Sequence, residues 1–209
     1  MFPIRDDNPH YLTPYATYAI IALNVAAWLL VQGLGMEPQL SRAVCAFGLI
    51  PVDLLGNVPA GTRLPLGPDL ACVVAPGFSG HTLFTSMFMH GGWLHLLGNM
   101  WFMWIFGNNV EDSMGHARFV LFYLLCGLVA AVLQIISNPQ SGIPMVGASG
   151  AIYGVMLAYS LTWPDRTIML IFPPVAFRAI WLIPLLFFMT LAFGGGNISH
   201  IGHLGGVLV

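Results

Sequence analysis

The chain has 209 residues, of which 57% are hydrophobic and only 7% are charged, and its mean hydropathy is +0.82. Soluble domains carry about 25% charged residues, so this composition excludes a water-facing globular domain and indicates an integral membrane protein. The formal net charge is −2 and all six basic residues are arginines, which excludes a basic surface for nucleic acid.

Apolar runs along the chain predict an all-α membrane protein with six spanning helices, because a span needs about 20 mostly apolar residues. The first run is too long for a signal peptide, so we expect it to be retained as a helix. The last run would form about 18 Å of helix against a bilayer core of about 30 Å, so we expect a truncated sixth helix. The expected spans are residues 15–35, 92–107, 117–136, 149–163, 179–193 and 198–209.

The first two expected spans are separated by a long connection, residues 36–80, which is rich in proline and glycine. Connections of this length are usually functional or disordered, and we interpret this one as an outer loop of a single domain. Cys45 and Cys72 both lie in it. A disulfide between them requires an oxidising compartment, and the sequence leaves this pairing open.

The second expected span ends in a polar stretch, Gly107–Asp112, which we interpret as a turn. If the N-terminus is inside, four arginines lie on the cytoplasmic side and two in the long outer loop. This distribution favours a cytoplasmic N-terminus. The four inner arginines are Arg5, Arg118, Arg166 and Arg178.

Ser149 opens the fourth expected span and lies between two glycines, Gly147 and Gly150. Glycine lets other groups approach closely, and the start of a helix leaves unpaired N–H groups and the positive end of the helix dipole beside the hydroxyl. This setting suits a nucleophile and its developing oxyanion. The alternative interpretation is a serine N-cap with glycines that allow tight helix packing.

Two further polar clusters lie in spans, where ionisable groups are costly and face the interior of a bundle. His95 and Asn99 are four residues apart, so they project from one face of a helix. His200 and His203 lie in a glycine-rich stretch of the sixth span. In the expected topology both clusters and Ser149 enter the membrane from one side. A histidine could therefore activate the serine while His95 and Asn99 stabilise an oxyanion.

Two other functions fit polar groups inside a membrane. The histidines could hold a metal ion, but no Asp or Glu lies in the expected spans to complete a site, so we expect neither metal nor cofactor. A small transporter or channel would use a polar cavity for passage, but the chain lacks the intramembrane acidic residues or paired broken helices that mark such pathways.

Three segments in this order, His90–Asn99, Gly147–Gly150 and Gly202–Gly206, resemble the rhomboid intramembrane serine proteases. The resemblance covers nearly the whole chain and implies a six-helix bundle with a Ser–His dyad that opens to the outer face. By match to the family motifs, Ser149 would be the nucleophile and His203 the general base.

The resemblance also implies roles for the groups around the dyad. His95, Asn99 and the backbone N–H of Ser149 would form the oxyanion hole, and Tyr153 would pack against the base. No metal or cofactor is implied. The remaining supporting residues would be Gly147, Gly150 and His90.

The implied function is endopeptidase cleavage of transmembrane segments of other membrane proteins within the lipid bilayer. The alternative is a non-proteolytic rhomboid-like protein that binds membrane clients. Such a protein is expected to lack the serine or the base, and both are present here. We expect a multi-pass protein of a bacterial inner membrane with a cytoplasmic N-terminus, and we predict no oligomeric state.

Overall fold

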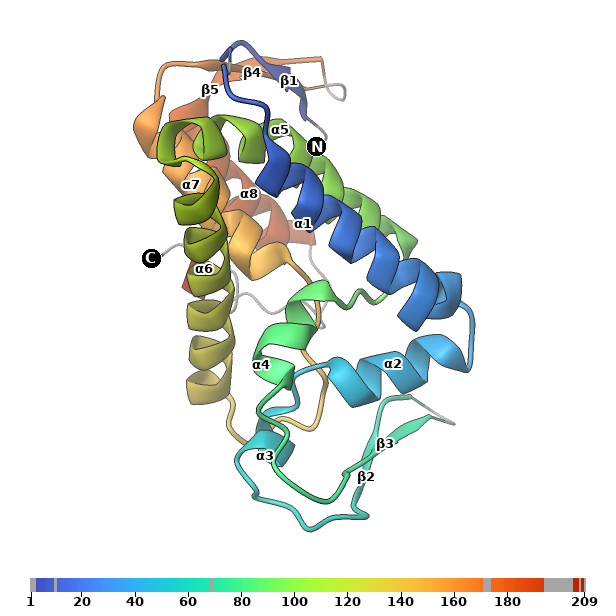
Figure 1. Cartoon of the computed structure of the whole chain (residues 1–209). Helices are drawn as coiled ribbons and strands as arrows, with labels where there is room; N and C mark the ends of the chain where they lie inside the picture. The colour runs from blue at the N-terminus through green and yellow to red at the C-terminus, as the bar shows by residue number, and fades with distance from the viewer. Residues whose placement is uncertain are drawn as a thin grey trace.

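The computed structural model describes residues 3–9, 11–67, 70–170, 174–193, 205, 206 and 208. Figure 1 shows a bundle of helices with a small sheet at one end and a β-hairpin at the other. We call these the sheet end and the hairpin end. The sheet consists of β1 (Pro3–Asp6), β4 (Thr167–Leu170) and β5 (Ala176–Arg178), and the hairpin of β2 (Arg63–Pro65) and β3 (Ala71–Val73).

The bundle is built from apolar helices whose positions follow the apolar runs of the sequence. Helix α7 packs against α5, α6 and α8, and α1 packs against α5. Of the helices in the described residues, α6 alone is both long and apolar enough to cross a membrane, and Tyr15–Val31 is a shorter apolar helix. The bundle helices are α1 (Tyr15–Ala26), continued by a π-helical turn at Ala27–Val31, α5 (Trp93–Met114), α6 (His116–Ser137), α7 (Ser149–Thr162) and α8 (Leu182–Phe193), which follows a 3-10 turn at Ala179–Trp181.

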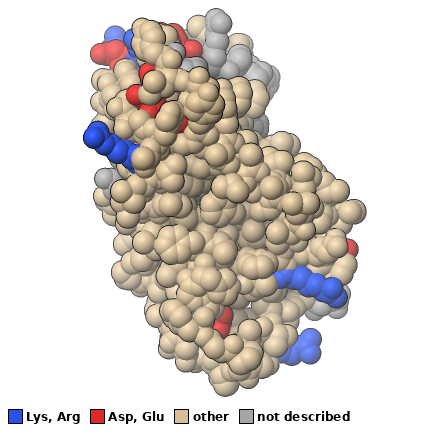
Figure 2. All heavy atoms as spheres, in the orientation of Figure 1, with Lys and Arg blue, Asp and Glu red and all other residues tan. Residues whose placement is uncertain are grey.

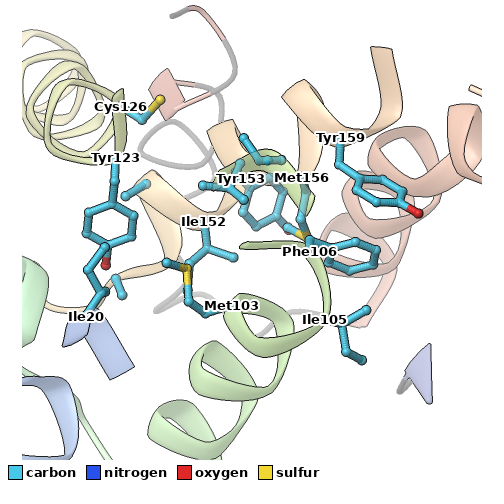
Figure 3. Packing of buried hydrophobic residues seen from close by; sticks show 14 of the residues in the cluster. Ile20, Met103, Ile105, Phe106, Tyr123, Cys126, Ile152, Tyr153, Met156 and Tyr159 are labelled. Atoms are coloured by element: carbon cyan, nitrogen blue, oxygen red, sulfur yellow. The ribbon is translucent and has the colours of Figure 1, made fainter. Parts of the chain in front are cut away.

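Large buried side chains from α5, α6 and α7 interlock in the centre of the bundle. Figure 3 shows Met103 and Phe106 of α5 beside Ile152 and Tyr159 of α7. Phe106 and Tyr159 meet edge to face, with ring centroids 5.0 Å apart. This packing fixes α7, which begins at Ser149, against α5, which carries His95 and Asn99.

The predicted polar turn at Gly107–Asp112 is wrong, because α5 continues through it to Met114. The polar side chains of this stretch find buried partners that a turn would not provide. Glu111 is fully buried and accepts hydrogen bonds from the backbone N–H groups of Ala16 and Thr17, at 2.8 and 2.7 Å. The chain reverses instead at Gly115, where φ is +78°.

The segment predicted as the long loop 36–80 contains regular structure and a small core of its own. It holds α2 (Gln39–Phe47), α3 (Pro51–Leu54) and the β2–β3 hairpin, and α4 (Thr82–Thr85) follows it. A disulfide joins Cys45 on α2 to Cys72 on β3. Cys72 lies in a cluster with Ile50, Val52, Leu64 and Val74.

The sheet end was not predicted from the sequence, which indicated only helices and loops there. Strand β4 lies between β1 and β5, and both pairs are antiparallel. Residues of β4 alternate between buried and more exposed, with Ile168 fully buried in the main core. This alternation is the period of a strand with one face on a core.

Most of the sixth expected span, 198–209, lies outside the described residues. Gly205 and Gly206 are described, and both pass very close to the bundle helices. A Cβ atom on Gly205 would lie 2.5 Å from Cα of Ala130 on α6, and one on Gly154 of α7 would lie 2.6 Å from the carbonyl oxygen of Gly206. Only glycine permits this approach.

Charged groups on the face shown in Figure 2 lie toward the two ends of the molecule, and the band between them shows only uncharged residues. This distribution fits the composition, because a charge in the hydrocarbon layer is costly. The described chain is thus a mostly helical protein suited to a membrane.

Candidate active site

Ser149 is the first residue of α7, and Ala148 occupies the N-cap position without a side-chain capping bond. The alternative interpretation of Ser149 as the N-cap is therefore wrong. The N-terminal ends of α5 and α7 both point toward the hairpin end (Figure 1). The hydroxyl thus lies where the first N–H groups of α7 and the positive end of its dipole are available.

A cavity of about 790 Å³ opens beside Ser149. Its lining includes the other polar residues that the sequence singled out on α5 and α7, namely His95, Asn99 and Tyr153. Tyr153 lies one helical turn after Ser149 and is 6% exposed. The structure therefore brings these four residues to one space inside the bundle.

Gly147, two residues before Ser149, lies close to His95 and Asn99 of α5. Its φ is +122°, and a Cβ atom there would lie 2.7 Å from Cε1 and Nε2 of His95 and 3.6 Å from Nδ2 of Asn99. Its backbone N–H donates to the carbonyl oxygen of Ser86 at 2.9 Å. The position therefore requires glycine for both its conformation and its contacts.

One hydrogen bond of His95 indicates which of its nitrogens carries the proton. The backbone N–H of Gly91 donates to Nδ1 of His95 at 3.3 Å, so Nδ1 presents a lone pair. In a neutral imidazole the proton then lies on Nε2, the atom that faces Gly147. His95 thus presents an N–H donor beside the Ser149 segment.

Asn99 supplies a second donor on the same face of α5, one turn after His95. The side chain is 8% exposed, and Nδ2 has no hydrogen-bond partner among the described residues. A buried donor without a partner destabilises a protein by about 1–3 kcal/mol. The amide is therefore suited to bind an oxygen that enters the cavity.

His90 is fully buried just before α5, and its ring meets the ring of His95 edge to face, with centroids 5.1 Å apart. Burial of the ring and then the nearby His95 lower the pKa of His90 to about 3, so it is neutral at physiological pH. The hydrogen bonds that hold this segment come from its backbone, which donates to and accepts from the Gln32 side chain at 2.9 and 2.6 Å.

Sequence reasoning missed Gln32 and the contacts of the loop that leads to Ser149. The backbones of Leu49 and Met145 exchange two hydrogen bonds, at 3.0 and 2.8 Å, and the Val52 N–H donates to the Ser141 carbonyl at 3.1 Å. The hairpin end therefore braces this loop.

For Gln32, the only signal in the sequence was a polar side chain at the end of an apolar run.

The predicted base His203, with His200 and Gly202, lies outside the described residues. Its sequence neighbours Gly205 and Gly206 are described, and a Cβ atom on Gly206 would collide with the carbonyl oxygen of Gly150, the residue after Ser149. In the described part of the chain, no group of three or more His, Cys, Asp or Glu residues could hold a metal ion.

Comparison with known proteins assigns the family. A family model described as the Rhomboid domain matches residues 78–209, more than half of the chain, including the Ser149 segment and both donors on α5. The chain belongs to the rhomboid family.

Three curated relatives show what this rhomboid protein is similar to, and the names of two of them give a location. The mouse presenilin-associated rhomboid-like protein, mitochondrial, is 30% identical over 129 residues, which cover 59% of this chain and 34% of that protein. Rhomboid-like protein 11, chloroplastic, of Arabidopsis thaliana is 30% identical over 139 residues, which cover 60% of this chain and 48% of that protein. RHOMBOID-like protein 1 of the same plant is 29% identical over 208 residues, 92% of this chain and 50% of that protein.

The matched regions thus span about a third to a half of these relatives. Rhomboid membership agrees with the composition and the helical fold in identifying an α-helical membrane protein. Two of the relatives are named as mitochondrial and chloroplastic, and they give no support to the expected bacterial inner membrane.

Proposed function

We propose that this rhomboid protein is an intramembrane serine endopeptidase that cleaves transmembrane segments of other membrane proteins. The observation that carries this proposal is the convergence of one hydroxyl and two N–H donors. Ser149, at the start of α7, shares a cavity with His95 and Asn99, whose donor nitrogens face Gly147. Acyl transfer needs this combination of nucleophile and oxyanion donors.

In the proposed reaction, the Ser149 Oγ attacks the carbonyl carbon of the scissile peptide bond while the base, His203, takes the hydroxyl proton. The carbonyl oxygen becomes an oxyanion that accepts hydrogen bonds from Nε2 of His95, Nδ2 of Asn99 and the Ser149 N–H. Collapse breaks the C–N bond, and the amine leaves with the proton from His203. Water, deprotonated by the same histidine, then hydrolyses the acyl ester and regenerates the serine.

The assignment of His203 as the base rests on the sequence match and on the packing of the residues that follow it. Gly206 lies against Gly150 and Gly154 in the first turns of α7, and His203 precedes Gly206 by three residues in the sequence. We expect His203→Ala to lose cleavage as completely as Ser149→Ala does. Cleavage retained by a folded His203→Ala protein would refute this role.

A membrane-embedded substrate fits the lining of the cavity. Apolar side chains from three parts of the fold, Met87, Met156 and Leu186, contribute to it beside the polar groups. An apolar segment suits such a cavity, because it can pack against the apolar side chains and brings no charge that would need solvation. We therefore assign transmembrane segments as the substrate class, within a six-helix rhomboid bundle.

The test is covalent labelling of the purified protein in lipid by a fluorophosphonate probe, with Ser149→Ala as the control. We expect labelling of the wild type and none of the variant, and the same pattern for cleavage of a reconstituted transmembrane substrate. Equal labelling of both proteins would show that another residue reacts. A wild type that neither labels nor cleaves would favour the non-proteolytic, client-binding alternative.

The proposed orientation places the sheet end on the cytoplasmic side, because Arg118, Arg166 and Arg178 lie near it. The disulfide lies at the other end, where an oxidising space would favour it. A membrane-impermeant maleimide should reach Asn57→Cys in intact cells and Asp165→Cys only after lysis. The reverse pattern would invert the assignment.

A further inference from the structure

We propose that Asp6 is a positioning residue for the active site, acting as a clamp between the two helices that carry the reactive groups. This inference rests on the proposed function. Asp6 is the last residue of β1, at the sheet end, on the opposite side of the bundle from the N-terminal ends of α5 and α7 (Figure 1). It has no place in the catalytic machinery described above.

A single carboxylate oxygen of Asp6 joins both helices. Oδ2 accepts a hydrogen bond from the hydroxyl of Tyr159 on α7 at 2.6 Å and from Nδ2 of Asn109 on α5 at 2.8 Å. The Tyr159 and Asn109 side chains are 0% and 1% exposed. In Figure 3 the Tyr159 oxygen points away from the labelled core residues. Hydrogen bonds to a charged acceptor are among the stronger ones in proteins, and these two are partly buried.

The clamp lies at the same distance along each helix from the residues that it would position. Ten residues separate Ser149 from Tyr159 on α7, and ten separate Asn99 from Asn109 on α5. At 1.5 Å per residue, both spacings are about 15 Å. A sliding motion of α7 relative to α5 would therefore break one of the two bonds to Oδ2. By opposing that motion, the clamp holds the serine and the amide donor at one relative height.

The neighbouring Asp7 separates this role from simple docking of the N-terminal strand. The backbone N–H of Asp7 donates to the Thr167 carbonyl at 3.2 Å, and Oδ1 of Asp7 accepts from the Thr167 N–H at 2.9 Å. These bonds hold β1 to β4 without joining α5 to α7. Asp7→Ala is therefore a matched control that loosens the same strand.

The experiment compares Asp6→Ala, Asp6→Asn and Asp7→Ala in lipid, at a temperature where all are folded, for cleavage of a transmembrane substrate. Loss of the clamp should lower kcat at least about 10-fold and leave KM within about 2-fold, because small misplacements of reacting groups act mainly on the chemical step. Asp6→Asn keeps an oxygen that can accept both bonds, so it should stay within about 3-fold of wild type. Asp7→Ala should change kcat by less than about 2-fold.

Two results would overturn the clamp: an unchanged kcat in Asp6→Ala, or equal losses in Asp6→Ala and Asp7→Ala. If the wild type itself neither cleaves nor labels, the proposed function fails, and hydrogen exchange decides the clamp alone. The clamp requires faster amide exchange in the first turns of α7, from Ser149, in Asp6→Ala than in Asp7→Ala. Equal protection in the two variants would refute it.

Discussion

The backbone of Gly147 lies directly against the imidazole ring of His95, and the structure leaves no room for a side chain between them. This contact joins the loop before α7 to the first turns of α5. It sets how far the Ser149 segment lies from the donor nitrogen Nε2, so the spacing of the whole site depends on the smallest residue in it.

Gly147→Ala should therefore reduce activity by about 100-fold or more, because the methyl group would displace either the His95 ring or the Ser149 segment. The positive φ of Gly147 adds backbone strain for any other residue. The measurement is the rate of fluorophosphonate labelling in lipid. Gly67→Ala is the control, because a Cβ atom there meets nothing within 4 Å. Labelling at the wild-type rate in Gly147→Ala would contradict the geometry.

Asn99→Ala should lower kcat by about 10²- to 10³-fold and leave KM little changed, because a lost oxyanion donor acts on the transition state. The orphan Nδ2 atom points to this role, since a donor that only packs would be expected to have a partner. Substrate cleavage at several concentrations separates the two constants. A kcat within about 2-fold of wild type would show that Asn99 serves in packing and does not stabilise the oxyanion.

Glu111→Ala should destabilise the fold by at least about 1–3 kcal/mol, because it leaves buried backbone N–H groups at the start of α1 without an acceptor. The Glu111 carboxylate is fully buried, caps the start of α1 through two backbone N–H groups, and also accepts bonds from Thr17 and His116. Thermal unfolding in one detergent gives the comparison. Asp165→Asn is the control, because its ion pair with Arg178 is exposed and should contribute less than about 1 kcal/mol. Equal midpoints for the two variants would contradict the prediction.

The apolar runs of the sequence predicted the positions of α1, α6, α7 and α8, because segments that are excluded from water are rich in apolar residues. The sequence also identified Ser149, His95 and Asn99 as residues that enter from one side, and the structure lines one cavity with all three. These predictions needed only hydropathy, helical periodicity and span direction. They did not need any knowledge of which residue contacts which.

The errors share a different cause. Glu111 and Asn109 extend α5 through a stretch that composition alone marks as a turn, because their partners lie about a hundred positions away, in Thr17 and Asp6. Strand β1 could not be predicted either, because its partner β4 lies far away in the sequence and meets it only when the bundle has formed. The local sequence around a polar residue on a helix does not indicate its hydrogen-bond partner when that partner comes from a distant segment.

The Cys45–Cys72 disulfide should support the active site as well as the fold. It ties α2 to β3, and the chain after α2 continues into Leu49 and Val52, which hold the loop before Ser149 by three backbone hydrogen bonds. Replacing both cysteines by serine should lower the free energy of unfolding by about 2–4 kcal/mol and slow fluorophosphonate labelling. A reducing agent should do the same to the wild type but add nothing to the double variant, because the remaining Cys126 is a buried free thiol. Labelling that is insensitive to both treatments would show that the hairpin end is braced sufficiently by its own core.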